Sequence, residues 1–258
     1  MIAGGELKTE DNADGVIEGR NAIIEALRAG VAIDKVFITK GETDPALLYI
    51  ASAARGSGAV VVETDRRKLD SMSKRHAHRG VIALAARKEY VTVSDILEIA
   101  KQRKEEPHIV LCDGISDPHN LGAIIRSCEA AGVHGVIIPK HRSAGLTATV
   151  VKTSSGSIYH MAIARVTNLS STIEELKEAG VWVFGISPDG KEPLWECDFT
   201  GSAAFVIGSE GAGLSRLVSE KCDLSIRIPM YGKVASLNAS VSAAIMVYEA
   251  ARQRAALR

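Results

Sequence analysis

The first third of the chain alternates between apolar and polar blocks in a way that predicts a small α/β domain. Apolar positions three and four apart predict helices at Asn21–Ala29, ended by Gly30, and at Pro45–Ala54. A basic helix is expected at Arg66–Ser73, and short β-branched runs predict strands at Val36–Ile38, Val60–Val62 and Val81–Ala85. We therefore expect one domain over 16–86, preceded over 1–15 by a polar, acidic and loose tail that resembles no targeting signal.

The pattern changes after residue 86, and we expect 87–106 to be a linker with a first helix and 107–258 to be a second domain. Six apolar runs predict strands there, separated for the most part by helical patterns. They are Ile109–Cys112, Val136–Ile138, Met161–Ala164, Val181–Ile186, Ala203–Ile207 and Leu224–Ile228. Continuous apolar strands joined by helices predict a mostly parallel sheet that is covered on both faces. The fold class is therefore α/β.

The last predicted helix, Leu237 to about Arg254, is apolar almost all the way round. A helix without a polar face is expected to be buried on several sides. This helix can reach that state by entering the fold of its own chain or by packing against a second copy of the chain. The sequence leaves both alternatives open.

Composition and charge narrow the class only slightly. The 258 residues are 46% hydrophobic and 24% charged, and 31 basic residues balance 31 acidic ones. Zero net charge argues mildly against a nucleic-acid partner, but basic residues gather between Thr64 and Tyr90, where eight face three acidic ones. They are Arg66, Arg67, Lys68, Lys74, Arg75, Arg79, Arg87 and Lys88. This cluster is either a solvated face or a nucleic-acid contact.

Metal and membrane partners are not expected. Cys112, Cys128, Cys197 and Cys222 are widely spaced without a CxxC pair, which predicts isolated buried thiols in a reducing cytoplasm. The seven histidines show no ligand spacing either; they are His76, His78, His108, His119, His134, His141 and His160. The chain also lacks an uninterrupted apolar stretch of about 18 residues, the length that a membrane helix needs.

Three polar turns carry the candidate chemistry: Asp117–Ser127, Val206–Ser215 and Pro229–Ser242. Each lies between an apolar run and a helical pattern, where α/β proteins bind ligands. The glycines of the second turn are not spaced as GxGxxG, and no Lys-Ser/Thr pair follows, so a dinucleotide fold and a phosphate loop are disfavoured. Because Glu210 lies within this turn and would repel phosphates, an uncharged or cationic ligand is favoured.

The runs DPHNLGAIIRS, VIGSEGAGLS and IPMYGKVASLNASVSAAIMVYE resemble, in order, the three motifs of the SPOUT methyltransferases of the TrmH/SpoU class. The likeness spans the chain from about Ile109 to its end. The first domain, through EGRNAIIEAL and HRGVIA, resembles the L30e-like RNA-binding extension of this class. The resemblance implies a trefoil-knotted SPOUT domain, a homodimer, S-adenosyl-L-methionine as cofactor, and methyl transfer to a ribose 2′-hydroxyl of RNA. The two-domain arrangement is most similar to members that modify a guanosine in 23S ribosomal RNA.

The resemblance also implies a set of site residues. The catalytic residues would be Asn120, Arg126, Glu210, Ser236 and Asn238. Gly208, Ile228 and Leu237 would hold the adenosyl group, largely through main-chain atoms. Glu210 would orient Arg126 or balance the sulfonium charge. Arg126 would bind phosphate and stabilise the developing alkoxide or, transiently neutral, remove the hydroxyl proton, although a guanidinium pKa above about 12 makes it a poor base.

Local sequence offers simpler interpretations of the same residues. Asn120 and Ser236 each precede or open a helical pattern and could be helix caps, although Asp117 is an equally good cap for the first helix. Arg126, in an otherwise apolar helix, could belong to a structural ion pair.

Several competing functions remain. Within the class these are a transfer-RNA 2′-O-methyltransferase and an antibiotic-resistance ribosomal methylase. Outside it they are a non-catalytic RNA-binding assembly factor and, distantly, a nicotinamide dehydrogenase.

Overall fold

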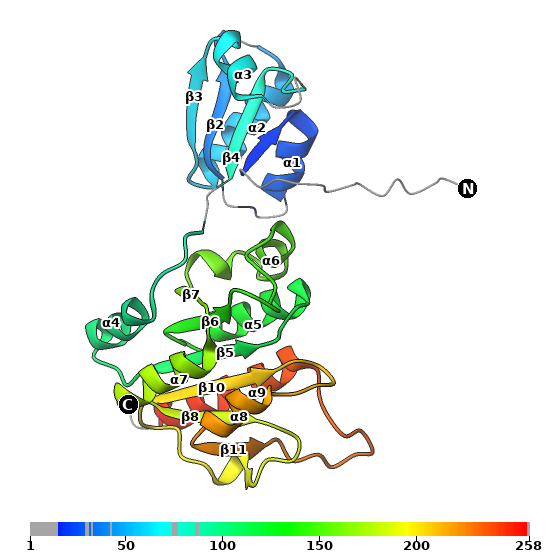
Figure 1. The fold of residues 1–258 in the computed structure, drawn as a ribbon. Coiled ribbons are helices and arrows are strands. Elements are labelled where there is room, and N and C mark those ends of the chain that lie inside the picture. Colours follow the sequence, from blue (N-terminus) through cyan, green and yellow to red (C-terminus); the bar gives the residue numbers. More distant parts are fainter. Residues whose placement is uncertain are drawn as a thin grey trace. The chain divides into compact units, whose positions relative to one another are not determined.

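A computed structural model describes residues 15–28, 31, 33–41, 43–73, 77–85 and 88–256 (Figure 1). The chain divides into two compact units at Arg87/Lys88. We call the described part of the first the N-terminal unit (15–85) and that of the second the C-terminal unit (88–256). Lys74, Arg75 and Arg87 of the basic cluster, and the expected tail except Gly15, lie outside the described residues.

The N-terminal unit is a four-stranded sheet with helices on both faces (Figure 1). Its elements are β1 (Val16–Glu18), α1 (Arg20–Arg28), β2 (Ile33–Thr39), α2 (Pro45–Gly56), β3 (Val60–Thr64), α3 (Arg66–Met72) and β4 (Val81–Ala85). The strand order is β1-β4-β2-β3; β4 runs antiparallel to β1 and β2, while β2 and β3 are parallel. Helices α1 and α2 pack on one face through Ile23 and Ile50, and α3 packs on the other through Leu69.

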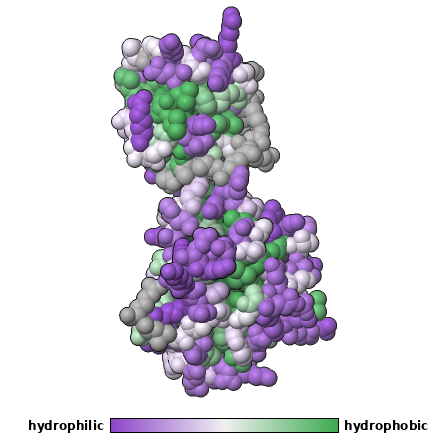
Figure 2. Space-filling model, turned by 90° about the vertical axis from the view of Figure 1, so that its left-hand side faces the viewer, coloured by the Kyte–Doolittle hydropathy of each residue, from purple (hydrophilic) through white to green (hydrophobic). Residues whose placement is uncertain are grey.

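The surface of this unit is mixed in character. Figure 2 shows a hydrophobic area on the N-terminal unit with hydrophilic side chains beside it. Leu48 and Val60 are among its exposed hydrophobic residues, whereas Arg66 and Arg67 on α3 are exposed and basic. Exposed basic side chains thus lie on α3, and others lie elsewhere on the unit, such as Lys35 on β2 and Arg55 on α2.

The C-terminal unit is built on a seven-stranded sheet in which all paired strands are parallel, in the order β7-β6-β5-β10-β8-β11-β9. The strands are β5 (His108–Asp113), β6 (Gly135–Pro139), β7 (Ile163–Val166), β8 (Trp182–Ile186), β9 (Glu192–Pro193), β10 (Ala203–Gly208) and β11 (Leu224–Arg227). The helices are α4 (Val93–Arg103), α5 (Pro118–Ala130), α6 (Ala148–Thr153), α7 (Leu169–Glu178), α8 (Arg216–Lys221) and α9 (Ala239–Ala255), with 3-10 turns at Ser157–Tyr159 and Leu194–Glu196.

Alternate residues of the central strand β5 point into two separate cores. Val110 and Cys112 pack with residues of α5, α6 and α9, whereas Ile109 and Leu111 pack with residues of α4, α7 and α8. This two-sided burial explains why the strands are continuously apolar. The predicted α/β class, with a mostly parallel sheet covered on both faces, is confirmed; the trefoil knot stays a prediction.

Helix α9 begins later than expected and is not buried all round. Its N-cap is Asn238, whose Oδ1 accepts hydrogen bonds from the backbone N–H groups of Ser240 (2.9 Å) and Val241 (3.4 Å). Met246 is buried against the sheet, but Val241 and Tyr248 are 45% and 52% exposed. A single chain thus leaves one side of α9 uncovered, and burial by a second copy stays a prediction.

The four cysteines are free, but only Cys112 and Cys128 are buried, so the expectation of buried thiols is wrong for Cys197 and Cys222. The burial of Cys112, and the partial burial of Cys222 together with the charge of Asp223, raise the pKa of these two thiols to about 12. Within the described ranges, no cluster of three or more His, Cys, Asp or Glu side chains could hold a metal ion. In the same part of the chain, none of the helices combines the length and apolar character that crossing a membrane requires.

Candidate functional site

A cavity of about 650 Å³ lies at the carboxyl ends of β8, β10 and β11 and at the start of α9. Its size is in the range of small-molecule sites. Its walls are formed mainly by three loops, 186–189, 207–214 and 235–239, together with Ser219, Ile228, Met230 and Ser242. The position follows the rule that ligands of parallel sheets bind beyond the carboxyl ends of the strands.

The loop after β10 turns back sharply on itself. The backbone N–H of Ser209 donates to the Gly213 carbonyl (3.0 Å), and the Gly213 N–H donates to the Ser209 carbonyl (2.9 Å). A Cβ atom at Gly208 would lie 2.3 Å from the Gly213 carbonyl carbon, which is much closer than two non-bonded carbon atoms approach. Glycine at 208 is therefore required for this turn, and the turn places Glu210 at the cavity wall.

Three side chains from distant parts of the chain meet beside this turn. Asn120 Nδ2 donates to Glu210 Oε1 (3.1 Å), and Asn238 Nδ2 donates to Asn120 Oδ1 (3.0 Å) and to Glu210 Oε1. The cap that Asn238 Oδ1 forms on α9 fixes the direction of its amide group. We call these residues the Asn120–Glu210–Asn238 cluster. Capping and membership of the cluster are compatible for Asn238, because they use different atoms.

The other capping expectations have a clear outcome. Asp117 is the N-cap of α5 and accepts from the His119 N–H at 2.9 Å, so Asn120 is not needed as a cap. Ser236 does not cap α9, because Asn238 does; Ser236 is exposed and lines the cavity. The local signal for a cap was real but belonged to the asparagine two residues later.

Arg126 lies apart from this cluster. It is exposed on α5, and its Nη1 donates to Ser155 Oγ at 3.2 Å. Arg126 follows Asn120 by six positions on α5, which places them about 9 Å apart along the axis and about 120° apart around it. Within the described part of one chain, Glu210 and Asn120 bond to each other and to Asn238, and Arg126 bonds to Ser155 instead; the orientation of Arg126 by Glu210 stays a prediction.

The cavity wall is acidic. Asp189 and Glu210 are the charged residues among the described side chains that line it, and Lys, Arg and His are absent from that set. Such a wall disfavours a phosphate and suits a neutral or cationic ligand. Asp189 was missed in the sequence, although Pro188-Asp189-Gly190 is a polar turn directly after a predicted strand and could have been found by that criterion.

The predicted cofactor residues Gly208, Ile228 and Leu237 all line the cavity, together with Glu210, Ser236 and Asn238. Asn120 adjoins it through its bonds to Glu210 and Asn238. Arg126 is outside the wall. The structure thus brings the predicted residues together with this one exception, while their individual roles stay predictions.

Comparison with known proteins agrees with this architecture. Residues 107–248 match the SpoU rRNA Methylase family, and residues 16–91 match a domain described as RNA 2′-O ribose methyltransferase substrate binding. The chain is 43% identical over 236 residues to YacO of Bacillus subtilis (strain 168), whose name places it in the TrmH family of tRNA/rRNA methyltransferases. That alignment covers 92% of this chain and 94% of YacO.

Two solved structures differ in how much of the chain they cover. The AdoMet-bound rRNA methyltransferase from Sinorhizobium meliloti covers 92% of this chain with 86% of its own, at 27% identity and a TM-score of 0.62. The TrmH/SpoU tRNA modifying enzyme of A. aeolicus covers 64% of this chain with 84% of its own, at 29% identity and a TM-score of 0.55.

Proposed function

The chain belongs to the SpoU rRNA methylase family, and we propose that it methylates the ribose 2′-hydroxyl of a guanosine in 23S ribosomal RNA. It is an RNA 2′-O-ribose methyltransferase that uses S-adenosyl-L-methionine. The observation that carries the proposal is the acidic cavity with the Asn120–Glu210–Asn238 cluster at its wall. The choice of a guanosine in 23S ribosomal RNA rests on the likeness of the two-domain arrangement to that of the bacterial enzyme RlmB.

The cavity fits the cofactor in size and in charge. Gly208, Ile228 and Leu237 would hold the adenosyl group, and Asp189 and Glu210 would offset the positive charge of the sulfonium. The bound cofactor supplies an electrophilic methyl group. The protein's task is then to hold the 2′-hydroxyl oxygen in line with that methyl group, because correct placement can supply much of the rate enhancement.

Glu210 is held so that one carboxylate oxygen remains available. Both amide donors bond to Oε1, and within the described residues no donor reaches Oε2. We assign to Oε2 the orientation of the substrate hydroxyl and the acceptance of its proton as the bond from oxygen to the methyl group forms. To Arg126, whose guanidinium stays charged, we assign contact with an RNA phosphate and electrostatic stabilisation of the developing alkoxide.

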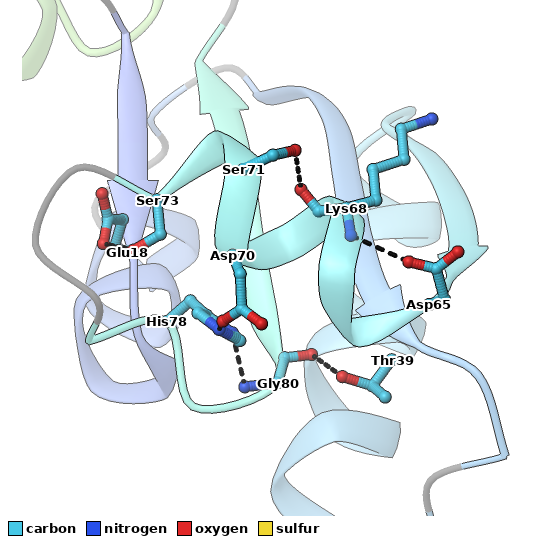
Figure 3. A network of polar contacts seen from close by, with 9 residues as sticks. All are labelled: Glu18, Thr39, Asp65, Lys68, Asp70, Ser71, Ser73, His78 and Gly80. Carbon is cyan, nitrogen blue, oxygen red and sulfur yellow. Dashed lines mark hydrogen bonds and ion pairs between the residues drawn. The ribbon is translucent and has the colours of Figure 1, made fainter.

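The N-terminal unit would contact the RNA through the turn from His78 to Gly80, whose polar contacts are drawn in Figure 3. Buried His78 accepts from the Gly80 N–H (3.1 Å) at Nδ1 and bonds to Asp70 (2.9 Å) at Nε2. Arg79 between them is exposed and has a positive φ of 46°. With Arg66 and Arg67 on α3, this turn would contact the phosphate backbone, which contributes most of the affinity of such contacts.

The protein would act as a homodimer in the cytoplasm. Exposed Val241 and Tyr248 lie seven residues, about two turns, apart on α9, so they share a side of the helix. A second copy that covered this side would complete the burial of α9. Association measured by analytical ultracentrifugation, and its loss in a Val241→Lys/Tyr248→Lys variant, would test this part.

Coverage by the comparison structures favours ribosomal over transfer RNA. The neighbour described as an rRNA methyltransferase matches 92% of the chain, whereas the tRNA modifying enzyme matches 64%. A substrate-binding domain over 16–91 accompanies the methylase domain in this chain. Transfer RNA remains the second candidate, because the name of the Bacillus relative includes both substrates.

The test uses labelled S-adenosylmethionine with separate ribosomal and transfer RNA pools from cells that lack these methylations. Nucleoside mass spectrometry then locates the product. We expect 2′-O-methylguanosine in 23S RNA alone. Label in transfer RNA would overturn the substrate, and cofactor binding by calorimetry without transfer to either RNA would favour a non-catalytic assembly factor.

A further inference from the structure

Ser155 occupies a position in the fold where a side chain is a disadvantage. It follows Ser154, the C-cap of α6, and has a φ of +50°. This first residue beyond a helix is commonly glycine, because a left-handed conformation crowds the Cβ atom of any other residue. Gly156, the next residue, has a φ of +87°. The turn therefore retains a serine where glycine would fit with less conformational strain.

The segment that carries Ser155 is locked onto α5. A Cβ atom at Gly122 would lie 1.8 Å from Thr153 Oγ1, so the two helices meet at the closest distance that glycine permits. Thr153 Oγ1 also lies 3.4 Å from the Pro118 carbonyl oxygen, at the start of α5. The hydroxyl of Ser155 is consequently held at a fixed place relative to α5.

The Ser155 hydroxyl meets the guanidinium of Arg126 at that place. Arg126 Nη1 donates to Ser155 Oγ at 3.2 Å. Both residues are exposed, and the flanking Ile124 and Ile125 on α5 are buried, so the helix itself is fixed in the core. An arginine with a held terminal group loses less conformational entropy when it binds an anion.

A left-handed residue after a helix is not in itself evidence of function. Lys104 has a φ of +56° at the C-cap of α4, and its long side chain is exposed. Ser155 differs because its side chain contacts a residue to which the proposed reaction assigns the RNA phosphate and the alkoxide. Lys104 is therefore the matched control for the backbone effect alone.

We propose that Ser155 is a positioning residue for Arg126, which it holds in the orientation that receives the RNA phosphate and stabilises the 2′-alkoxide. This inference rests on the proposed function. The Ser155 oxygen accepts one guanidinium N–H, and the other N–H donors, which bond to no other described residue, stay available to the RNA. Ser155 itself touches neither the RNA nor the cofactor in this scheme.

The test compares Ser155→Gly, Ser155→Ala and Ser155→Asn in single-turnover methyl transfer by the full chain. Glycine relieves the strain and removes the acceptor, so we expect an equal or higher Tm together with roughly a tenfold slower transfer. Alanine removes the acceptor and keeps the strain. Asparagine tolerates the left-handed conformation and offers a carbonyl oxygen, so it should restore most of the rate.

The controls separate positioning from folding. Lys104→Gly should likewise give an equal or higher Tm, but without changing the rate of methyl transfer. In an Arg126→Ala background, Ser155→Ala should have no further effect on the rate, because the two residues act as one unit. S-adenosylmethionine affinity should be unchanged in all Ser155 variants.

Two results would overturn the inference, and they can be told apart from a failure of the proposed function. Wild-type transfer by Ser155→Gly would make Ser155 a helix-ending residue and nothing more. Equal slowing by Ser155→Ala with and without Arg126 would show that it acts independently of the arginine. If the wild-type chain transfers no methyl group to any RNA, the proposed function fails first, and the inference fails with it.

Discussion

The two units contain polar networks of opposite construction. In the N-terminal unit, side chains hold the backbone: His78 bonds to the Gly80 N–H, Arg20 Nε donates to the Arg79 carbonyl, and Thr39 Oγ1 donates to the Gly80 carbonyl. In the C-terminal unit, backbone turns hold side chains: the glycine turn and the α9 cap bring Glu210 and Asn238 to the cavity. The first network exposes the charge of Arg79, and the second holds the polar atoms of Glu210 and Asn238 at fixed distances from one another.

This difference predicts different sensitivities to substitution. A charge on a turn contacts a long, uniformly charged RNA backbone, so the loss of one contact weakens binding by a modest factor. Where several side chains act at one reacting centre, changing one of them removes a larger part of the reaction rate. We therefore expect the largest effects in the Asn120–Glu210–Asn238 cluster and the smallest at Arg79.

The strongest test of this comparison is Glu210→Gln. A glutamine keeps an oxygen that can accept from Asn120 and Asn238, so folding and the cluster should persist while the negative charge is lost. We expect methyl transfer to slow by about a hundredfold or more. Single-turnover kinetics and thermal unfolding measure the two effects. Glu178→Gln, an exposed change at the end of α7, is the control; wild-type activity in Glu210→Gln would remove the residue from the reaction.

Gly208→Ala tests whether the backbone of the C-terminal unit positions the site. The added methyl group would lie 2.3 Å from the Gly213 carbonyl carbon and would force the turn open. Overpacking of this kind costs about 1–3 kcal/mol of stability, and we expect cofactor affinity to fall by at least about tenfold.

Calorimetry with S-adenosylmethionine and thermal unfolding measure the effects of Gly208→Ala. Gly201→Ala, where a Cβ atom would meet no atom within 4 Å, is the control. Unchanged cofactor affinity in Gly208→Ala would mean that the turn does not form part of the cofactor site.

The sequence predicted the regular part of this fold because regular elements depend on local periodicity. The runs at Val81–Ala85 and Ala203–Ile207 became strands with nearly the predicted bounds. The three-residue strand β1 was missed, because it is defined by antiparallel pairing with β4 rather than by its own composition. Short edge strands carry too few residues for a pattern.

The candidate site was predictable in its members but not in its connections. Resemblance to the family motifs supplied Asn120, Glu210 and Asn238, and the fold brought them together. Two features escaped: Arg126 bonds to Ser155 rather than to the cluster, and Asp189 lines the cavity. Ser155 could not be found, because a Ser-Ser-Gly sequence does not say which residue adopts the left-handed conformation.

The two units also differ in how they hold a buried histidine. His78 in the N-terminal unit has partners at both ring nitrogens, whereas Nε2 of buried His108, at the start of β5, has no hydrogen-bond partner within the described structure. Burial lowers the pKa of His108 to about 3, with the charges of Arg254 and His134 adding to the effect.

Acid should therefore destabilise the C-terminal unit through His108. Below about pH 6.5 the unfolded chain binds a proton at His108 that the folded chain does not bind. The contribution of neutral His108 to the free energy of unfolding is therefore fully present above that pH and is lost as the pH falls toward 3. Between pH 7 and pH 5 the loss is about 2 kcal/mol. Chemical denaturation at both values measures it, and His108→Gln should reduce the pH dependence by that amount. An unchanged dependence would contradict the assignment.

The smallest effect is expected for Arg79→Gly, which separates the charge of the N-terminal turn from its backbone. The Val81 N–H donates to the His78 carbonyl (3.0 Å), and Arg79 and Gly80 between them have φ values of 46° and 85°, as in a type I′ turn. Glycine adopts a positive φ without steric strain, so the free energy of unfolding should rise by about 1 kcal/mol. RNA affinity should nevertheless fall about threefold to tenfold, with a salt slope lower by about 0.7 to 0.9.

Two other variants are the controls for the effects of Arg79→Gly on stability and on RNA affinity. Arg79→Lys keeps both the charge and the strain and should match the wild type in each measurement. Arg55→Ala removes an exposed charge from α2, on the other face of the sheet, and should leave RNA affinity unchanged. If Arg79→Gly bound RNA as tightly as the wild type, the network around His78 would be a folding device, and the contrast between the two units would reduce to one of stability.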